Sequence, residues 1–341
     1  MRTISLVTGA AGFIGSFLVE RLLSEGIPVR AFLKRGTASK TVVASKAEVF
    51  EGDIKDAASM SRAMEGVDVV YHLAAISRYD TNIPDEEYYS VNVEGTRNIL
   101  DAARNAGVRK VVFTATIEAV GVSSDGKPLT EDSPQQPRNI YGQSKLDAEN
   151  LVIDSHRRHG LDAVVVRPPM IYGPGNTILC KRLFGIIRRG FYPLIGDGRA
   201  LTEFCYVKNQ VHGIRLAADK GRAGEVYFIS DARSYSIEEI VDTIARVMGV
   251  RVIKPRIPVP VALAMGWSFE MLAKVLRFYP FVIPETGRPP FSRKTVAWTA
   301  ESRLYCDISK ARRELGYNPP FSLEDGVRET VDWYRANGFI R

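Results

Sequence analysis

The chain of 341 residues is 45% hydrophobic and 25% charged, a composition typical of a globular protein with a large buried core. Its net charge of +7 is spread over scattered Lys and Arg residues with no basic run between aromatic side chains, so no nucleic-acid partner is expected. The three cysteines are widely spaced, which argues against a disulfide framework and a metal site. The first residues already have a strand pattern, so no signal peptide is expected. Together these features predict a cytoplasmic protein.

The first 170 residues alternate β-rich runs with amphipathic helical patterns, which predicts an α/β fold with a doubly wound parallel (Rossmann) sheet. Strands are expected at Ile4–Thr8, Val29–Leu33, Glu48–Glu51, Val69–His72, Lys110–Thr114 and Ala163–Arg167. Helices are expected at Phe13–Ser24, Ala57–Met64, Glu86–Asn105, Ile140–His159, Thr177–Arg189, Lys208–Ala218 and Ile237–Met248. Long irregular stretches separate the later helices. We therefore predict a Rossmann domain over 1–170, to which the chain returns later, and a mainly substrate-binding lobe over 171–341.

The longest apolar stretch, Val259 to Ile283, contains charged residues and is flanked by prolines, so a membrane-spanning helix is not expected there. Apolar side chains recur in it at helical spacing, at Leu263, Trp267, Met271, Leu272, Val275 and Phe278. We expect this face to pack in the core. The alternatives are a lid over an apolar substrate and a surface that makes peripheral contact with a membrane.

A glycine-rich turn, TGAAGFIG, links the first predicted strand to the first predicted helix. Gly9, Gly12 and Gly15 have the spacing and context of a dinucleotide-binding turn. Glycine permits a tight turn and a close approach of a pyrophosphate to the backbone, and the helix N-terminus supplies amide donors. The motif therefore predicts that a dinucleotide binds here.

The second predicted strand ends in Leu33, Lys34 and Arg35, where NAD-selective proteins of this fold usually carry an acidic residue. Two cations suit the 2′-phosphate of NADP better than the free ribose hydroxyls of NAD. NADP is therefore favoured over NAD, although Lys34 and Arg35 also fit a solvated strand end, which would leave the choice open.

Tyr141 and Lys145 are four positions apart at the start of a predicted helix, so both side chains project from one face. A phenol has an ordinary pKa of about 10, and a nearby ammonium and an oxidised nicotinamide favour its phenolate form. Tyr141 is thus the candidate acid/base, and Lys145 would hold the nicotinamide ribose. Thr116, after the fifth predicted strand, is the candidate that orients the substrate oxygen.

The chain resembles the extended short-chain dehydrogenase/reductase superfamily over nearly its whole length, through TGAAGFIG, Asp53-Ile54, HLAA at 72–75, VNVEGT at 91–96, and the Tyr141 and Lys145 pair. By that resemblance Asp53 and Ile54 flank the adenine, and Leu73, Ala74 and Ala75 line the nicotinamide side. His72 packs at a strand end. The resemblance implies further cofactor contacts from Ala11, Phe13, Ile14, Asn92, Thr114, Pro168, Met170 and Ile171. It also implies a homodimer through the helices at Glu86–Asn105 and Ile140–His159.

The substrate side decides which branch of the superfamily the chain resembles. Met170 and Thr202 replace the Asn and Arg that grip a sugar nucleotide in relatives, and residues 298–302 lack the usual R-x-G-D segment, although Arg199 and Arg303 could partly substitute. Ile117 replaces the acid that 4,6-dehydratases need, and Glu118 is interpreted as structural. The pattern is more similar to the 3β-hydroxysteroid dehydrogenase and sterol-4α-carboxylate dehydrogenase branch.

The resemblance thus implies an NAD(P)-dependent oxidoreductase for a hydroxyl group on a bulky, steroid-like apolar molecule. A nucleotide-sugar epimerase is the alternative enzyme. A cofactor-bound scaffold without turnover is a third possibility, and the intact Thr116, Tyr141 and Lys145 set argues against it.

Overall fold

The computed structural model describes residues 4–37, 46–77, 83–123, 125–177, 179–276, 293, 296 and 304–340, with only the backbone described at 179–182 and 273–276. Its main sheet has seven parallel strands in the order β3-β2-β1-β4-β5-β6-β11. The strands are β1 (Ile4–Thr8), β2 (Val29–Lys34), β3 (Glu48–Gly52), β4 (Val67–His72), β5 (Lys110–Thr114), β6 (Ala163–Arg167) and β11 (Val226–Phe228). The strand order reverses between β1 and β4, so a crevice opens at their carboxyl ends.

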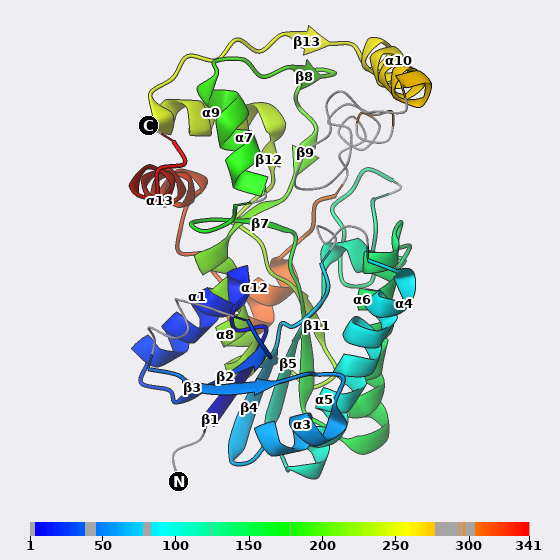
Figure 1. The fold of residues 1–341 in the computed structure, drawn as a ribbon, viewed down its shortest axis with the longest axis vertical. Helices are drawn as coiled ribbons and strands as arrows, with labels where there is room; N and C mark the ends of the chain where they lie inside the picture. The colour runs from blue at the N-terminus through cyan, green and yellow to red at the C-terminus, as the bar shows by residue number, and fades with distance from the viewer. Residues whose placement is uncertain are drawn as a thin grey trace.

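Helices cover both faces of this sheet (Figure 1). One face carries α1 (Phe13–Ser24), α8 (Val207–Lys220) and α12 (Ser309–Leu315), and the other carries α3 (Ala57–Ala63), α5 (Gly95–Asn105) and α6 (Ile140–His159). Each face buries its own apolar cluster, with Leu18 and Ile214 in the first and Ile99 and Val152 in the second. The doubly wound parallel fold predicted from the sequence is therefore confirmed.

The helix predicted over Glu86–Asn105 is present but is not regular throughout. It starts as α4 (Asp85–Tyr88), widens into the π-helical segment η1 (Tyr89–Glu94) and continues as α5. The wide turn carries Asn92 inward, where its side chain bonds to the loop after β4 and to α6. These tertiary bonds account for a departure that apolar spacing does not reveal.

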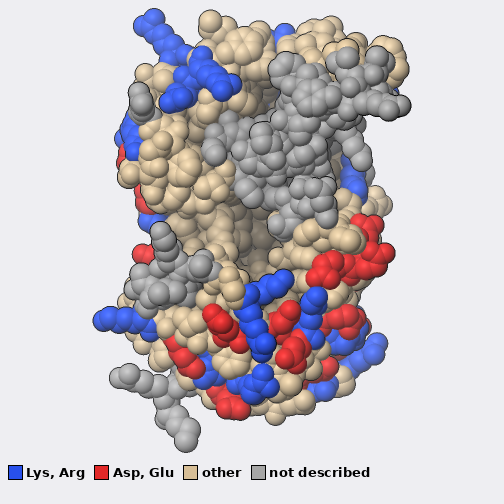
Figure 2. Space-filling view, in the orientation of Figure 1, with Lys and Arg blue, Asp and Glu red and all other residues tan. Residues whose placement is uncertain are grey.

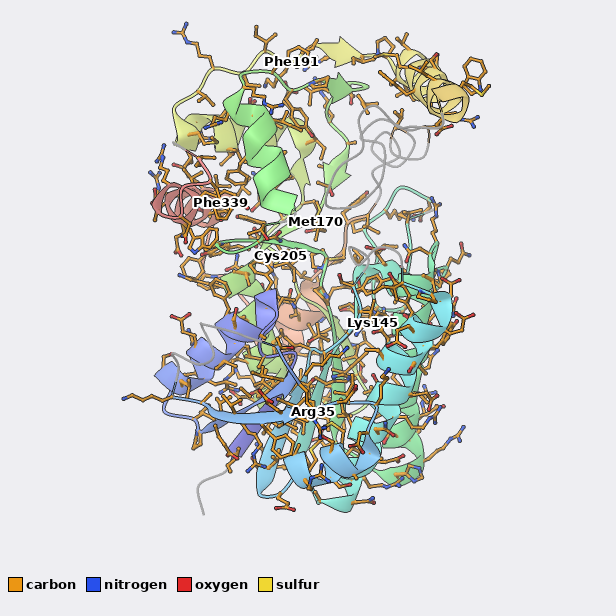
Figure 3. The ribbon with its side chains drawn as sticks, in the orientation of Figure 1. Arg35, Lys145, Met170, Phe191, Cys205 and Phe339 are labelled. Atoms are coloured by element: carbon orange, nitrogen blue, oxygen red, sulfur yellow. The ribbon has the colours of Figure 1, made fainter. Side chains whose placement is uncertain are left out.

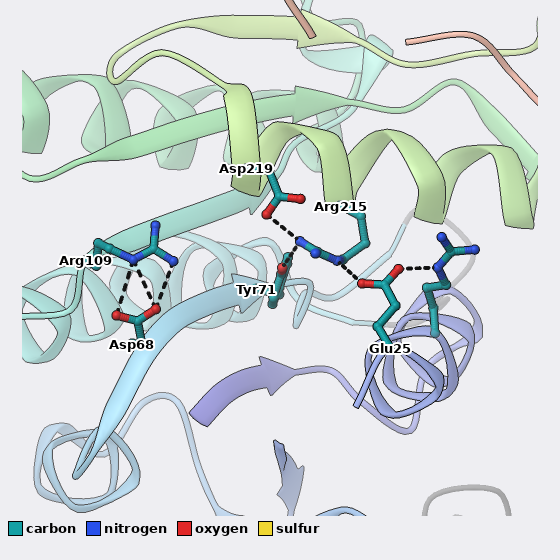
Figure 4. A network of polar contacts seen from close by, with 7 residues as sticks. Glu25, Asp68, Tyr71, Arg109, Arg215 and Asp219 are labelled. Carbon is teal, nitrogen blue, oxygen red and sulfur yellow. Dashed lines mark hydrogen bonds and ion pairs between the residues drawn. The ribbon is translucent and has the colours of Figure 1, made fainter. Parts of the chain in front are cut away.

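The chain returns to the sheet after residue 171 through α8, β11 and α12. Arg215 on α8 donates to the Tyr71 hydroxyl of β4 at 3.1 Å and to Glu25, just after α1, at 2.9 Å (Figure 4). Asp219 accepts from the same guanidinium at 2.9 Å. Tyr71 is buried, and burial raises its pKa to about 12, so it bonds to Arg215 as a neutral phenol. This network fastens the late helix to the first half of the chain.

The remaining elements form a second layer beyond the carboxyl ends of the sheet (Figure 1). It contains β7 (Met170–Tyr172) paired with β10 (Phe204–Tyr206), β8 (Leu194–Ile195) with β13 (Arg256–Ile257), β9 (Leu201–Thr202) with β12 (Tyr235–Ser236), and the helices α7 (Leu179–Arg188), α9 (Ile237–Met248), α10 (Val259–Leu276) and α13 (Leu323–Ala336). Its core is rich in aromatic side chains, and the rings of Tyr172 and Phe204 stack at 4.1 Å.

Residues 259–276 of the apolar stretch predicted to pack in the core form α10, and that expectation is wrong for the described part of its face. Trp267, Met271 and Leu272 are exposed and Leu263 is half-buried, while the side chain of Val275 and the whole of Phe278 lie outside the described part of the structure. The helix lies at the edge of the second layer and packs through small residues, Ala262 and Gly266, which are buried. Among the described helices, none is long and apolar enough to cross a membrane.

Candidate active site

The glycine turn after β1 is shaped by close backbone contacts. Gly9 has φ +70°, and a Cβ there would lie 2.8 Å from the Ala74 amide nitrogen. A Cβ on Gly15 would lie 2.1 Å from the Gly9 carbonyl oxygen, so only glycine lets α1 start this close to the turn. Gly12 is the N-cap of α1, and no side chain caps the helix. Its first amide groups therefore remain available to a phosphate.

A cavity of about 470 Å³ opens at this turn, between the sheet and the second layer. Figure 2 shows the hollow between the lower and upper parts of the molecule, and Figure 3 shows Lys145 below it and Met170 above it. The lining includes most of the predicted site: Gly9, Gly12, Phe13, Ile14, Gly15, Leu73, Ala75, Thr114, Thr116, Tyr141, Lys145, Pro168, Met170 and Ile171. The glycine turn and the proposed catalytic residues thus face one space.

The cavity lining does not include the other predicted cofactor residues, Ala11, Lys34, Arg35, Asp53, Ile54, Ala74 and Asn92. Lys34 and Arg35 are exposed where β2 ends, and Gly52, beside Asp53, pairs with Lys34 across the neighbouring strand. Ile54 is buried against Gly95. The two cations and Asp53 therefore share one edge of the sheet outside the cavity, and their contact with an adenosine stays a prediction.

Several lining residues were not predicted as site residues: Ser77, Ala115, Ile117, Glu118, Pro169, Gly175, Asn176, Thr177, Thr202, Glu203 and Leu304. Thr202, Glu203 and Leu304 come from the second half of the chain and meet the first half only in the folded protein. Ala115 and Ile117 flank Thr116, and Pro169 lies between two predicted residues, so these neighbours were within reach of the sequence motifs.

The buried side chain of Asn92 holds the loop after β4 against the start of α6. It accepts from the Ile76 amide at 2.8 Å and donates to the Ile76 carbonyl at 3.2 Å and to Ser144 Oγ at 2.9 Å. Ser144 in turn donates to the Tyr141 carbonyl at 3.0 Å. The buried amide therefore links the loop after β4 to the turn of α6 that carries Tyr141 and Lys145.

His72 is held inside the fold by two hydroxyl groups. Thr96 donates its only hydroxyl proton to the Asn92 carbonyl at 2.6 Å, so it accepts from His72 Nε2 at 2.9 Å. His72 Nδ1 then accepts from Thr8 Oγ1 at 2.9 Å. Burial, together with the nearby Lys145, lowers the pKa of His72 well below its ordinary value. The ring is neutral and fully bonded, which is consistent with the packing role expected for it.

Two capped turns bring the catalytic candidates together. Thr116 is the N-cap of η2 (Ile117–Ala119), and Asn139 is the N-cap of α6, accepting from the Gly142 amide at 2.7 Å. Asn139 also donates to Glu118 at 2.8 Å, and a Cβ on Gly142 would lie 2.5 Å from the Glu118 carbonyl oxygen. The start of α6 therefore lies directly against η2, with Thr116 and Tyr141 on the same cavity wall.

Lys145 is a buried amine beside the cavity. Its Nζ lies 4.2 Å from the centre of the Phe113 ring, and only 2% of the residue is exposed. Burial lowers its pKa to about 7, against the opposing charge of Glu149 one turn along α6. Glu149 is itself paired with the buried Arg167, at 2.5 and 3.0 Å. The amine can therefore change its protonation state near neutral pH.

The residues present fit a bound nicotinamide dinucleotide. The uncapped start of α1 leaves amide donors for its phosphates, and the missing Cβ atoms of Gly9 and Gly15 allow the close backbone packing that forms this turn. Thr114 Oγ1 is buried on the cavity wall without a hydrogen-bond partner among the described residues, and a buried polar atom of this kind requires one. Within the described residues, no group of three or more His, Cys, Asp or Glu could hold a metal ion.

Comparisons with known proteins identify the family of this chain. The model of the NAD dependent epimerase/dehydratase family matches residues 5–230. The chain is 33% identical to a 4-hydroxy-2-methyl-3-oxo-4-farnesyl-3,4-dihydroquinoline-1-oxide ketoreductase from Stigmatella aurantiaca, covering 96% of this chain and 95% of that one. It is 32% identical to a 3 beta-hydroxysteroid dehydrogenase/Delta 5-->4-isomerase from Mycobacterium tuberculosis, covering 96% and 90%.

Solved structures show the same architecture. The crystal structure of gox2253 matches with a TM-score of 0.82 and 26% identity over 99% of both chains. A dTDP-glucose 4,6-dehydratase from Streptomyces venezuelae, DesIV, solved with NAD and DAU bound, matches with a TM-score of 0.74 and 30% identity over 98% of this chain and 97% of that one. With its parallel sheet, its glycine turn and its Tyr141 and Lys145 pair, this chain belongs to the NAD-dependent epimerase/dehydratase family of extended short-chain dehydrogenases/reductases.

Proposed function

We propose that this protein is an NAD(P)-dependent dehydrogenase or reductase that interconverts a secondary alcohol and a ketone on a bulky, steroid-like apolar substrate. The observation that carries the proposal is the lining of the cavity. Thr116, Tyr141 and Lys145 face the same space as apolar side chains from both halves of the chain, among them Ile117 and Leu304.

Tyr141, Thr116 and Lys145 each have a separate role in the proposed reaction. Tyr141 exchanges a proton with the substrate oxygen, and Thr116 orients that oxygen by a hydrogen bond. The amine of Lys145, on the same helix, favours the phenolate when it carries its proton. The dinucleotide, when bound, supplies the hydride acceptor or donor. The backbone amides at the start of α1 and the hydroxyl of Thr114 would hold it.

The substrate class is argued from what surrounds the proton-transfer residues. Met170 and Thr202 stand on the cavity wall where relatives that grip sugar nucleotides usually carry Asn and Arg. A diphosphate buried there would lack those partners, whereas an apolar ring system would match the wall. The printed names of two relatives, a hydroxysteroid dehydrogenase and a ketoreductase for a farnesyl-substituted quinoline, support the same class.

A nucleotide-sugar epimerase is the second candidate, because Asn176, Thr177 and Glu203 add polar groups to the same cavity. The protein is mixed with NAD or NADP and either a 3β-hydroxysteroid or UDP-glucose. A dehydrogenase changes the nicotinamide absorbance in proportion to the steroid product. Sugar epimerisation without net change in absorbance, together with no steroid turnover, would overturn the proposal.

The role of Tyr141 is tested by Tyr141→Phe. Turnover should fall by orders of magnitude while cofactor affinity stays nearly unchanged, because the phenol acts in the chemical step. Tyr89→Phe is the matched control, since this exposed tyrosine of η1 is not part of the cavity lining. Comparable loss of cofactor binding in Tyr141→Phe would show that the residue acts structurally.

Cofactor preference is proposed to favour NADP, because Lys34 and Arg35 end β2 as two exposed cations. The double variant Lys34→Ala/Arg35→Ala should weaken NADP binding far more than NAD binding, since only NADP carries the 2′-phosphate. Binding constants for both dinucleotides check this. Equal losses for the two would exclude the phosphate contact.

A further inference from the structure

The outward face of α10 is apolar over residues 259–272, the part of the helix whose side chains the structure describes. Val261, Met265, Trp267, Met271 and Leu272 are all exposed, and 51% of Trp267 is accessible. The only charged residue between positions 259 and 272 is Glu270, which is half-buried and bonded to Arg293 at 2.9 Å. A helix at a protein surface ordinarily turns charged residues to water, so this face has the composition of one that contacts an apolar phase.

Two further exposed apolar side chains lie at the same end of the molecule. Phe191 and Ile253 belong to adjacent segments joined by a parallel bridge, and Ile253 is 70% accessible. The segment that carries Ile253 runs through β13 directly into α10. Figure 3 places Phe191 at the top of the molecule, in the same layer as α10 and farthest from the sheet.

Positive charge borders this surface. Arg188 and Arg189 immediately precede Gly190 and Phe191, and Arg251 lies just before Ile253. All three arginines are exposed, and no carboxylate of the described residues forms an ion pair with them. Figure 2 shows Lys and Arg side chains beside uncharged surface at this end.

Two carboxylates of α9 that face the segment around β13 are already neutralised, whereas the exposed Asp197, just after β8, has no ion pair among the described residues. Glu238 is paired with Lys254 at 3.1 Å and with Arg256 at 3.0 Å, and Asp242 is paired with Lys254 at 2.6 Å. The three free arginines are therefore not offset by these carboxylates, and the local field attracts anions.

We propose that this end of the molecule, here named the docking face (Arg188, Arg189, Phe191, Arg251, Ile253 and the exposed residues of α10), binds to the surface of an anionic lipid bilayer. The apolar face of α10 would lie in the headgroup and acyl boundary, with the three arginines among the lipid phosphates. Tryptophan favours that boundary. A second copy of the chain is a poorer occupant, because its docking face would bring the same arginines and no exposed carboxylate of the described residues to pair with them.

The test uses flotation of the full chain with vesicles of phosphatidylcholine, with and without phosphatidylserine. We expect binding to the anionic vesicles that weakens with salt. The triple variant Arg188→Gln/Arg189→Gln/Arg251→Gln should lose affinity by up to about a hundredfold, since each cation near an anionic surface contributes about fivefold. Trp267→Ser/Met271→Ser should lose roughly tenfold on both vesicle types, because apolar contact is removed.

The control variants make charge and apolar substitutions of the same kind on the sheet half. Arg62→Gln/Arg104→Gln/Arg157→Gln removes the same charge from α3, α5 and α6, and Val49→Ser removes an exposed apolar side chain from β3. Both should bind vesicles as the unchanged protein does, and cofactor affinity should be intact in every variant. The proposal does not depend on the reaction catalysed.

Three results would overturn it: no binding to either vesicle, equal loss of binding in the test and control variants, or light scattering that shows a dimer dissociated by Trp267→Ser/Met271→Ser. The last result would mean that a second copy covers the face.

Discussion

Replacing Lys145 by methionine is expected to stabilise the cofactor-free protein while it abolishes turnover. The amine is enclosed, and burial lowers its pKa from 10.5 to about 7. That difference corresponds to a cost of about 5 kcal/mol for keeping the ammonium form inside the folded protein. Methionine has a similar length and no charge. The loss of the contact between the Lys145 ammonium and the Phe113 ring destabilises the variant by roughly 1–2 kcal/mol. The net increase in its free energy of unfolding is therefore on the order of 3 kcal/mol at pH 6.

The gain must depend on pH in a defined direction. Below pH 7 the folded and the unfolded chain both carry the proton, so the full cost of the buried charge is present. Between about pH 7 and 10.5 the unfolded chain keeps its proton while the folded protein releases it, so the free energy of unfolding of the unchanged protein rises with pH. The advantage of Lys145→Met should therefore shrink across this window.

Urea denaturation at pH 6 and pH 9 measures both effects, with turnover assayed on the same samples. Lys110→Met is the matched control, because Lys110 is equally buried but its amine donates to Asp162 at 2.7 Å and to the Gly221 carbonyl. That control should lose stability at both pH values, since its partners are left unpaired. The reasoning about Lys145 is refuted if its methionine variant is destabilised to the same extent at pH 6 and pH 9.

Three other predictions follow from the same region. Gly15→Ala should weaken dinucleotide binding by one to two orders of magnitude in calorimetry, because its Cβ overlaps the turn, whereas Gly185→Ala, with open space around it, should not. Arg167→Met should lower the free energy of unfolding by about 3–5 kcal/mol, as it leaves Glu149 buried and unpaired, and Glu149→Leu in the same chain should recover much of that loss. The dinucleotide is expected to bind only when the Lys145 amine carries its proton, so its dissociation constant should rise about tenfold per pH unit above pH 7. A dissociation constant that does not change with pH would contradict this role of the ammonium.

Some of the fold was not predictable from local patterns. The strand β11 has only three residues and pairs with one neighbour, β6, so its apolar run is too short to stand out. The helix α12 is seven residues long and depends on packing against α8 and β11. For α13 a signal was present, because Ser322 and Asp325 form a capping box before an apolar helical pattern.

For α10 the sequence pattern predicted the helix but not the burial of its apolar face. Spacing correctly indicated a helix with one apolar side, but it carries no information on what that side meets. The helix contacts the protein through Ala262 and Gly266, which allow close packing, and leaves Trp267 exposed. Burial is decided by the position of the neighbouring elements and not by the helix itself.

The sequence by itself determined the parallel sheet, the glycine turn and the pairing of Tyr141 with Lys145. The individual strands and helices that alternate to build the sheet, the glycine turn and the spacing of Tyr141 and Lys145 each depend on residues close together in the chain, where periodicity and glycine geometry act directly. The tertiary structure alone decided that Thr202, Glu203 and Leu304 close the same cavity, and that Asn92 fastens α6 from behind. Those contacts join residues far apart in the chain, and they exist only because the later segments return across the carboxyl ends of the strands.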